Sequence, residues 1–278
     1  MSDTMQTIDA PCATCGDDPG ARPTSYVYAL GRIEARFPTL AVEKEFAQAS
    51  GRTDAGYRTD QQLFHDVLTR PGHRYLARQL CWVFTVQGLE TYLLEPVDPS
   101  DLDLLLEAIR PAPTPGDMDC IIGTAGPIAS PDRCNGLMVP IVAVEQTYSF
   151  DRAALVAAVP RPDRVKKEEF AAAVEDVVER IVQLADNAGA TDEHRALNYL
   201  ALRYPGIYAL AADAFGRNHS LTGVAVRPSG LSGTRRIVEV IFSFTHRATD
   251  VVERSFVRVD VTELFPFLVS KLSPYIER

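Results

Sequence analysis

The chain has 278 residues, of which 46% are hydrophobic and 23% charged, so it is an ordinary globular protein with room for one large domain or two small ones. Its formal net charge of −9 disfavours nucleic acid and anionic lipid as partners, and we expect neither. No signal peptide opens the chain, and no apolar run approaches the ~18 residues of a membrane span. A cytoplasmic protein is therefore expected.

The first half of the chain predicts more strands than helices. Residues 1–24, rich in Asp, Thr, Gly and Pro, predict a flexible tail, and order is expected from Tyr26 onward. In the first expected helix, Leu40, Phe46 and Ala47 are predicted to face the core. The expected elements are a strand from residue 26, helices at 39–50 and 60–70, a hairpin that turns at Gln87-Gly88, a helix from 102, and strands at 120–123 and 137–150, the last with Pro140 at an edge or bulge.

The second half begins with helices and ends with strands. Residues 160–163 form a possible seam between halves, after which an amphipathic helix is expected from residue 165 to Asn187. Then follow expected helices at 192–203 and 206–216, three strands within 220–261, and a final helix capped by Thr262 and interrupted at Pro266 and Pro274. This order is not a regular βαβ alternation, so it predicts an α+β fold with mixed or antiparallel sheets and a helical middle segment.

The strand over residues 237–244 has a strict two-residue alternation, so its side chains should divide between two faces. One face should carry Val238, Val240, Phe242 and Phe244, and the other Ile237, Glu239, Ile241 and Ser243.

No common catalytic motif occurs in the sequence. A nucleophile elbow, an HExxH zinc motif, a Walker A loop and a dinucleotide-binding glycine loop are all missing. The sequence GTAGP at 123–127 has the wrong spacing for a nucleotide site and is interpreted as a turn. Sequence motifs therefore leave the reaction, if there is one, undefined.

The cysteines are the best metal candidates. Cys12 and Cys15 form a CxxC pair that can direct two thiolates to one zinc ion, and Cys120 and Cys134 could complete the four ligands of a structural site. His65, His73 or His219 could substitute for one of them. The alternative is a tail with two free thiols and buried cysteines elsewhere, Cys81 among them. Five cysteines in so long a chain argue against a disulfide framework.

The densest polar cluster is the loop RPSGLSGTRR, which predicts a site for a carboxylate or phosphate. The candidate binding residues are Arg227, Ser229, Ser232, Thr234, Arg235 and Arg236. Arg235 and Arg236 point to opposite sides of the strand that follows, so only one of them should face a groove, and the other should pair with an acid such as Glu239 or Glu253. The alternative is a hairpin connection whose arginines are solvated or paired to acids.

Four stretches together resemble the domain found at the C-termini of PatG and PatA in cyanobactin biosynthesis. They are SYVYALGRIEARFPTLAVEKEF (25–46), CNGLMVPIVAVEQTYSFD (134–151), NYLALRYPGIYALAADAFGRNHSL (198–221) and RPSGLSGTRRIVEVIFSFTHRATDVVERSFVRVDVTELFPFLVSKLSPY (227–275). The resemblance runs from about residue 25 to the end and implies one PatG C-terminal-like domain.

The resemblance implies a setting in which ribosomally made peptides are modified, cut and sometimes cyclised. It implies no catalytic residue, because the shared domain has no assigned function and the protease domain of PatG has no counterpart here. We therefore expect an accessory binding or scaffold domain, in which a strand edge could hold a precursor peptide or a partner maturation enzyme, and a homodimer is possible. The alternatives are an enzyme of unfamiliar type that acts on a modified precursor peptide, and a zinc-stabilised structural domain.

Overall fold

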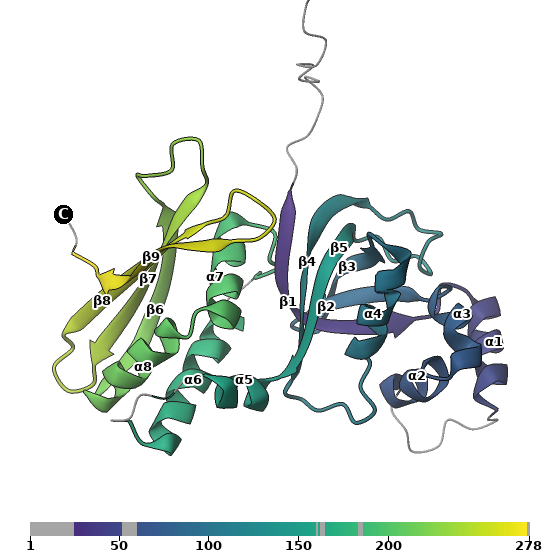
Figure 1. The fold of residues 1–278 in the computed structure, drawn as a ribbon, viewed down its shortest axis with the longest axis horizontal. Coiled ribbons are helices and arrows are strands. Elements are labelled where there is room, and N and C mark those ends of the chain that lie inside the picture. The colour runs from purple at the N-terminus through teal and green to yellow at the C-terminus, as the bar shows by residue number, and fades with distance from the viewer. Residues whose placement is uncertain (1–24, 52–59, 160, 162–164, 183–185, 277–278) are drawn as a thin grey trace, which may run out of the picture.

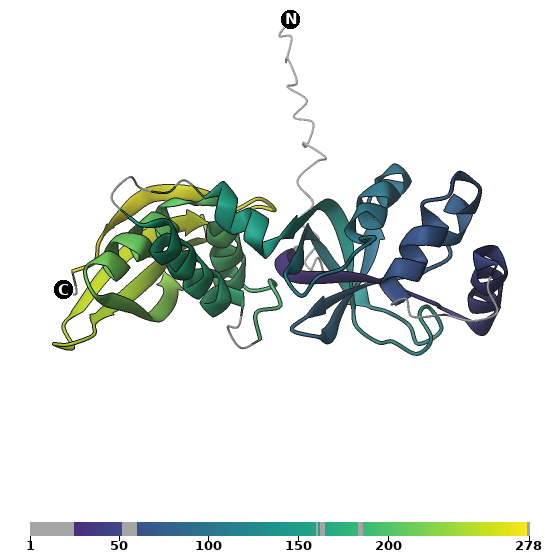
Figure 2. The same cartoon turned by 90° about the horizontal axis from the view of Figure 1, so that it is seen from below.

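The computed structural model describes residues 25–276, apart from 52–59, 160, 162–164 and 183–185. The described chain forms two lobes that lie side by side along the long axis of the molecule (Figures 1 and 2). The N-terminal lobe is a small barrel with helices packed against it, and the C-terminal lobe is a sheet covered by helices on one face. None of the helices in these ranges is long and apolar enough to cross a membrane.

Five strands close the barrel in the order β1-β2-β3-β5-β4. They are β1 (Tyr26–Arg36), β2 (Cys81–Val86), β3 (Leu89–Pro96), β4 (Asp117–Ile128) and β5 (Pro140–Asp151). All neighbours are antiparallel except β3 and β5, so the sheet is mixed. The β2–β3 hairpin turns at Gln87 and Gly88, whose positive φ angles of 52° and 79° fit the tight turn predicted there. Pro140 is the first residue of β5, where proline is tolerated.

Helices pack against the barrel, three of them beyond the end of β1 (Figure 1). They are α1 (Leu40–Ser50), α2 (Asp60–Leu68), the short α3 (Arg74–Ala77) and α4 (Leu102–Ala108). A further helix, α5 (Arg152–Ala158), follows directly after β5. The ring of Phe46 packs between those of Phe37 and Phe64, with centroids 5.2 Å and 4.9 Å away, and is buried as predicted. Leu40 and Ala47 are exposed, so their predicted inward placement is wrong, because α1 buries a single aromatic side chain.

The barrel depends on a change of partner within β1. Residues 26–31 of β1 pair with β4, and residues 32–36 pair with β2. At the change stands Gly31, where an added Cβ would lie 2.1 Å from the carbonyl oxygen of Thr85 and 2.9 Å from the ring of Phe84. Glycine is therefore required for the backbones of β1 and β2 to approach this closely.

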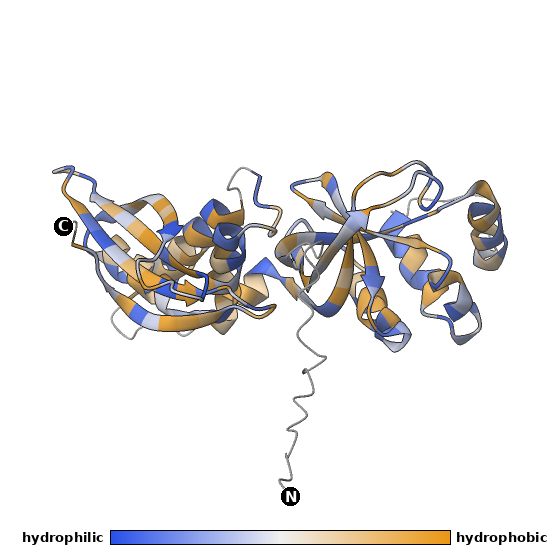
Figure 3. Cartoon of the chain, turned by 90° about the horizontal axis from the view of Figure 1, so that it is seen from above, coloured by the Kyte–Doolittle hydropathy of each residue, from blue (hydrophilic) through white to orange (hydrophobic). Residues whose placement is uncertain are grey.

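The C-terminal lobe is a sheet of four antiparallel strands in the order β6-β7-β8-β9. Its elements are α6 (Lys167–Val182), α7 (Asp192–Arg203), α8 (Gly206–Gly216), β6 (His219–Pro228), β7 (Ile237–His246), β8 (Val252–Asp260) and β9 (Phe267–Pro274). As predicted for β7, Val238, Val240, Phe242 and Phe244 face the helices. Hydrophobic and hydrophilic positions accordingly alternate along these strands (Figure 3). The α+β prediction with a helical middle segment is confirmed.

The last element differs from the prediction, because a strand replaces the expected final helix. Leu268 and Leu272 of β9 pack on the core, whereas Phe267 and Val269 are exposed, which is the two-residue period of a strand. Pro266 and Pro274 lie at the ends of this strand and leave its interior ladder intact. Thr262 caps no helix, and its Oγ1 donates to Asp260 and accepts from the backbone N–H of Arg236.

One of the hydrophobic clusters contains residues of both lobes. The outer faces of β1 and β4 contribute Tyr28, Leu30, Met118, Cys120 and Ile122 to the cluster that α6, α7 and α8 cover. Polar contacts tie the same surfaces, since the buried amide of Asn198 donates to the carbonyl of Tyr28 (2.8 Å). The backbone N–H of Tyr28 donates in turn to the carbonyl of Gly189 (2.9 Å). Strand β1 therefore belongs to the cores of both lobes.

The close approach at Gly31 leads to a prediction about stability. Replacement of Gly31 by Ala should lower the free energy of unfolding by several kcal/mol, because the Cβ would meet backbone atoms that cannot move aside without breaking the β1–β2 ladder. The matched control is Gly223→Ala in β6, where the nearest atom would lie 3.9 Å from the Cβ. Chemical denaturation of the two variants measures the difference. Equal, small effects at both glycines would contradict the role assigned to Gly31.

Candidate functional site

The predicted loop between β6 and β7 is held largely by its own protein. The Nε and Nη2 atoms of Arg227 lie 3.0 Å and 2.9 Å from one carboxylate oxygen of Glu239, and Arg258 lies 2.8 Å from the other. The guanidinium of Arg227 also stacks on the ring of Tyr275. Burial alone would raise the pKa of Glu239, but the hydrogen bonds from Arg227 and Arg258 outweigh it and hold the pKa below its usual value. Arg227 thus already has an anionic partner.

The hydroxyl groups of the loop are also directed mostly to the loop itself. Ser229 is buried and donates to Glu239 (3.3 Å), and Ser232 lies 2.7 Å from the carbonyl of Ser229 and 3.1 Å from that of Ile237. Thr234 is exposed. Because these bonds fix the turn, they support the interpretation of the segment as a hairpin connection.

The two adjacent arginines differ in their surroundings. Arg236 lies 3.2 Å from Asp192 at the start of α7 and donates to the carbonyl of Thr262 (2.8 Å). The acid partners expected from the sequence were wrong, because Glu239 is held by Arg227 and Arg258, and Glu253 pairs with Arg217. The side chain of Arg235 is 63% exposed and lies 3.6 Å from the buried Asp260. An anion site in this loop stays a prediction that depends mainly on Arg235.

The described cysteines do not assemble the predicted zinc site. Cys12 and Cys15 lie outside the described residues. Cys134 forms a disulfide with Cys81, which corrects both its assignment as a metal ligand and the expectation of no disulfide. Cys120 is a free thiol on the opposite, helix-covered side of the barrel, and burial raises its pKa.

Histidines do not complete the zinc site either. His65, His73 and His219 lie in α2, in the turn before α3 and at the start of β6. Within the described ranges, no three His, Cys, Asp or Glu side chains are arranged to hold a metal ion.

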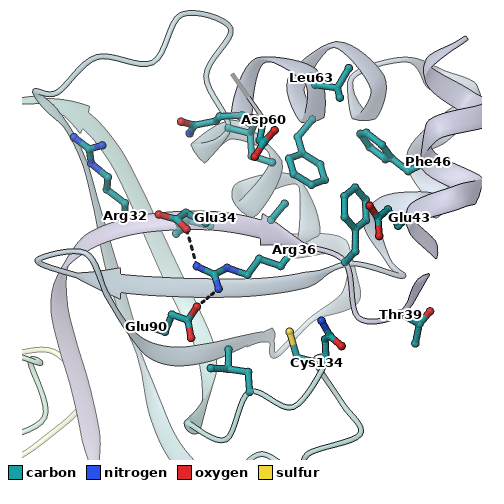
Figure 4. Close-up of a pocket in the computed structure, with 18 of the residues that line it drawn as sticks. Arg32, Glu34, Arg36, Thr39, Glu43, Phe46, Asp60, Leu63, Glu90 and Cys134 are labelled. Carbon is teal, nitrogen blue, oxygen red and sulfur yellow. Dashed lines mark hydrogen bonds and ion pairs between the residues drawn. The ribbon is translucent and has the colours of Figure 1, made fainter. Parts of the chain in front are cut away.

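A cleft of about 1220 Å³ lies in the N-terminal lobe, and no sequence motif indicated it. One wall is the end of β1, the other wall is α1 with the start of α2, and the loop of residues 134–138 closes one end (Figure 4). Leu40 and Met138 line it with side chains that are each 62% exposed. The half-buried Phe37 packs on Phe46 and Phe64 at its apolar side.

An ion-pair triad occupies the strand side of the cleft. The guanidinium of Arg36 lies between the carboxylates of Glu34 (3.2 Å) and Glu90, with which it forms a close ion pair (Figure 4). Between a third and a half of each of these side chains is exposed. Such partly solvated pairs contribute little to stability, so they can exchange partners when a charged ligand arrives.

A buried polar network supports the base of the cleft. Asp119 accepts hydrogen bonds from the backbone of Ile33 (2.8 Å), from Ser149 (2.7 Å) and from Arg110 (3.3 Å). Burial is the dominant influence and raises the pKa of Asp119 despite these donors. Because Asp119 is 1% exposed and every donor comes from the protein, we assign it a structural role, in which it fixes the position of β1.

The sequence did contain a signal for this site. Arg32, Glu34 and Arg36 alternate with Ile33 and Ala35 at the end of β1, so one face of a predicted strand is fully charged. What no local pattern could supply is the neighbourhood, because α1, β3 and the loop of residues 134–138 reach the site from distant parts of the sequence.

The chain is therefore an α+β protein in which a five-stranded barrel and a helix-covered sheet share a core. Residues 164–275 match the family model described as PatG C-terminal, and the match begins beside the predicted seam at 160–163. The predicted resemblance to the PatG C-terminal family is thus confirmed. No curated protein matches the chain.

A solved structure described as a PatG domain of unknown function has the same fold, with a TM-score of 0.70 and 21% sequence identity. The similarity covers 90% of this chain and 98% of that one, so it extends beyond the family match into the barrel.

The disulfide fixes the loop at one end of the cleft, and this leads to a second prediction. The Cys81–Cys134 bond spans 53 residues, so the chain-entropy relation gives it a stabilising effect of about 4 kcal/mol. Reduction, or the double change Cys81→Ser and Cys134→Ser, should lower the melting temperature by roughly 8 °C, at about 2 °C per kcal/mol. The double variant is the control, because its melting temperature should not respond to reductant. A wild-type protein whose melting temperature is unchanged by reductant would contradict the bond.

Proposed function

We propose that this chain is a binding module in a maturation pathway for ribosomally made peptides, and that the cleft beside β1 holds a segment of a precursor peptide. The PatG resemblance supports the choice of pathway, and the observation that carries the site is the cleft itself. It combines an apolar side with a charged rim, which is the usual composition of a ligand site.

The size of the cleft favours a peptide over a small metabolite. Its volume of about 1220 Å³ exceeds the roughly 300–1,000 Å³ of typical small-molecule pockets. It is neither fully enclosed nor flat, so a peptide segment can enter it from the protein surface. An extended segment several residues long fits this shape better than a compact ligand.

The described lining favours binding over covalent catalysis. The lining side chains within the described ranges include no histidine, serine or lysine. Cys134 is bonded to Cys81, and the hydroxyl of Thr39 caps α1 by accepting from the backbone of Val42. The usual combination of a nucleophile with an adjacent base is therefore not assembled by these residues.

A matched pair of double variants tests this proposal. Leu40→Ser with Met138→Ser should weaken binding of a fluorescent precursor peptide by at least about tenfold, because burial of one such side chain contributes ~1.5–3 kcal/mol. Both residues are largely exposed in the free protein, so its melting temperature should change little. Fluorescence anisotropy measures the dissociation constants.

The control carries the same type of change on the other lobe. Leu231 and Val251 are 64% and 57% exposed, and Leu231→Ser with Val251→Ser should leave peptide affinity unchanged. Equal affinity for both double variants would place the peptide site elsewhere, and the absence of binding to wild-type protein would remove the proposed function.

A further inference from the structure

The charges that line the cleft are strongly unbalanced. Among the described residues, six carboxylates and three guanidinium groups line it, and together they carry a formal charge of −3. The acidic residues are Glu34, Glu43, Asp60, Glu90, Asp117 and Asp119, and the basic residues are Arg32, Arg36 and Arg110. A cleft with one sign of charge concentrates ligands of the opposite sign.

Within the described lining, the carboxylates that make no ion pair lie on the helix side. Asp117 and Asp119 are paired with Arg110, and Glu34 and Glu90 share Arg36. The carboxylates of Glu43 of α1 and Asp60 of α2 make no hydrogen bond or ion pair to any described residue, and both residues are exposed. Both stand in the first turn of their helices, where the helix dipole favours the charged carboxylate.

The triad on the strand side has a formal charge of −1. Arg36 is a single positive charge shared between the two carboxylates of Glu34 and Glu90 (Figure 4). One negative charge of this triad is therefore left uncompensated. A second guanidinium or ammonium group would neutralise it without displacing Arg36.

From this geometry we infer that the cleft selects a peptide segment in which a Lys or Arg side chain stands next to a large apolar one. The inference rests on the proposed peptide-binding function and names its ligand class. The cation lies between the carboxylates of the two walls, and the apolar side chain covers Leu40, Met138 and Phe37. Such a segment pairs its cation with the carboxylates of the rim and buries its apolar side chain on the apolar surface.

An acidic segment does not fit the same site. The guanidinium of Arg32 donates to the carbonyl of Pro115 (2.6 Å), and that of Arg110 donates to the carbonyls of Met118 (3.1 Å) and Phe150 (3.2 Å). The remaining arginine, Arg36, already serves two carboxylates. Among these arginines only Arg32, which bonds through Nη2 alone, has donors left for a carboxylate ligand, and the excess negative charge of the described lining opposes its binding.

Three labelled octapeptides test the inference. Each has Gly-Ser at both ends, and the central four residues are Lys-Leu-Lys-Leu, Glu-Leu-Glu-Leu or Lys-Ser-Lys-Ser. Fluorescence anisotropy should give the Lys-Leu peptide at least about tenfold higher affinity than either of the others, with weaker binding at high salt. The intact chain is used throughout.

Charge-neutral variants locate the effect. Glu43→Gln with Asp60→Asn should reduce affinity for the Lys-Leu peptide about tenfold and remove most of its advantage over the Glu-Leu peptide. The control is Glu168→Gln with Glu175→Gln on α6, which removes the same charge from exposed positions of the other lobe and should leave both affinities unchanged.

The outcomes separate the inference from the proposed function. Equal binding of the Lys-Leu and Glu-Leu peptides, with both weakened by the Leu40→Ser and Met138→Ser changes, would overturn the charge selectivity and retain the peptide site. An equal loss of affinity in the Glu43 and Glu168 double variants would mean that only the net charge of the protein matters. That result would also overturn the inference. If neither these peptides nor the precursor peptide bind, the inference and the proposed function fail together.

Discussion

The close approach of β1 to β2 at Gly31 is the constraint on which the rest of the structure depends. Because β1 changes partner from β4 to β2 at this residue, one strand closes the barrel and also carries Glu34 and Arg36 to the cleft. The buried carboxylate of Asp119 holds the backbone of the same strand at Ile33. The position of the charged rim is therefore set by backbone geometry, which makes it a rigid platform for a ligand.

The same strand joins the barrel to the segment that matches the PatG family. Its outer face packs on the helices of the C-terminal lobe, and the buried Arg195 of α7 donates to the carbonyl of Val261 (2.7 Å) while its guanidinium lies over the ring of Tyr26. Burial lowers the pKa of Arg195 to about 10, which leaves it charged at neutral pH. The C-terminal lobe thus supports β1, whereas every described residue that lines the cleft belongs to the N-terminal lobe.

The sequence predicted most elements but not the site, and the reason is physical. Local patterns sufficed where apolar side chains recur with a regular period, as in α6, in α7 and on the helix-covered face of β7. They failed at β9, where the sequence FLVSKLSP between two prolines suits a helix as well as a strand until β8 supplies a partner. The cleft and the Cys81–Cys134 bond each combine residues that are far apart in the chain, which local patterns cannot show. Leu40 was predicted to lie in the core, so the sequence did not indicate that α1 exposes it to a ligand. The arginine loop was found by composition, but composition could not show that Glu239 and Asp192 already hold two of its arginines.

Backbone hydrogen exchange with and without a bound precursor peptide tests the central claim most directly, because it reports the location of the ligand without a mutation. We expect slower exchange on binding in residues 32–37, 40–46 and 134–138, with no change in the loop of residues 229–236 or in β9. Protection confined to the C-terminal lobe would contradict the cleft as the binding site. The loop that contains Arg235 would then be the next candidate site.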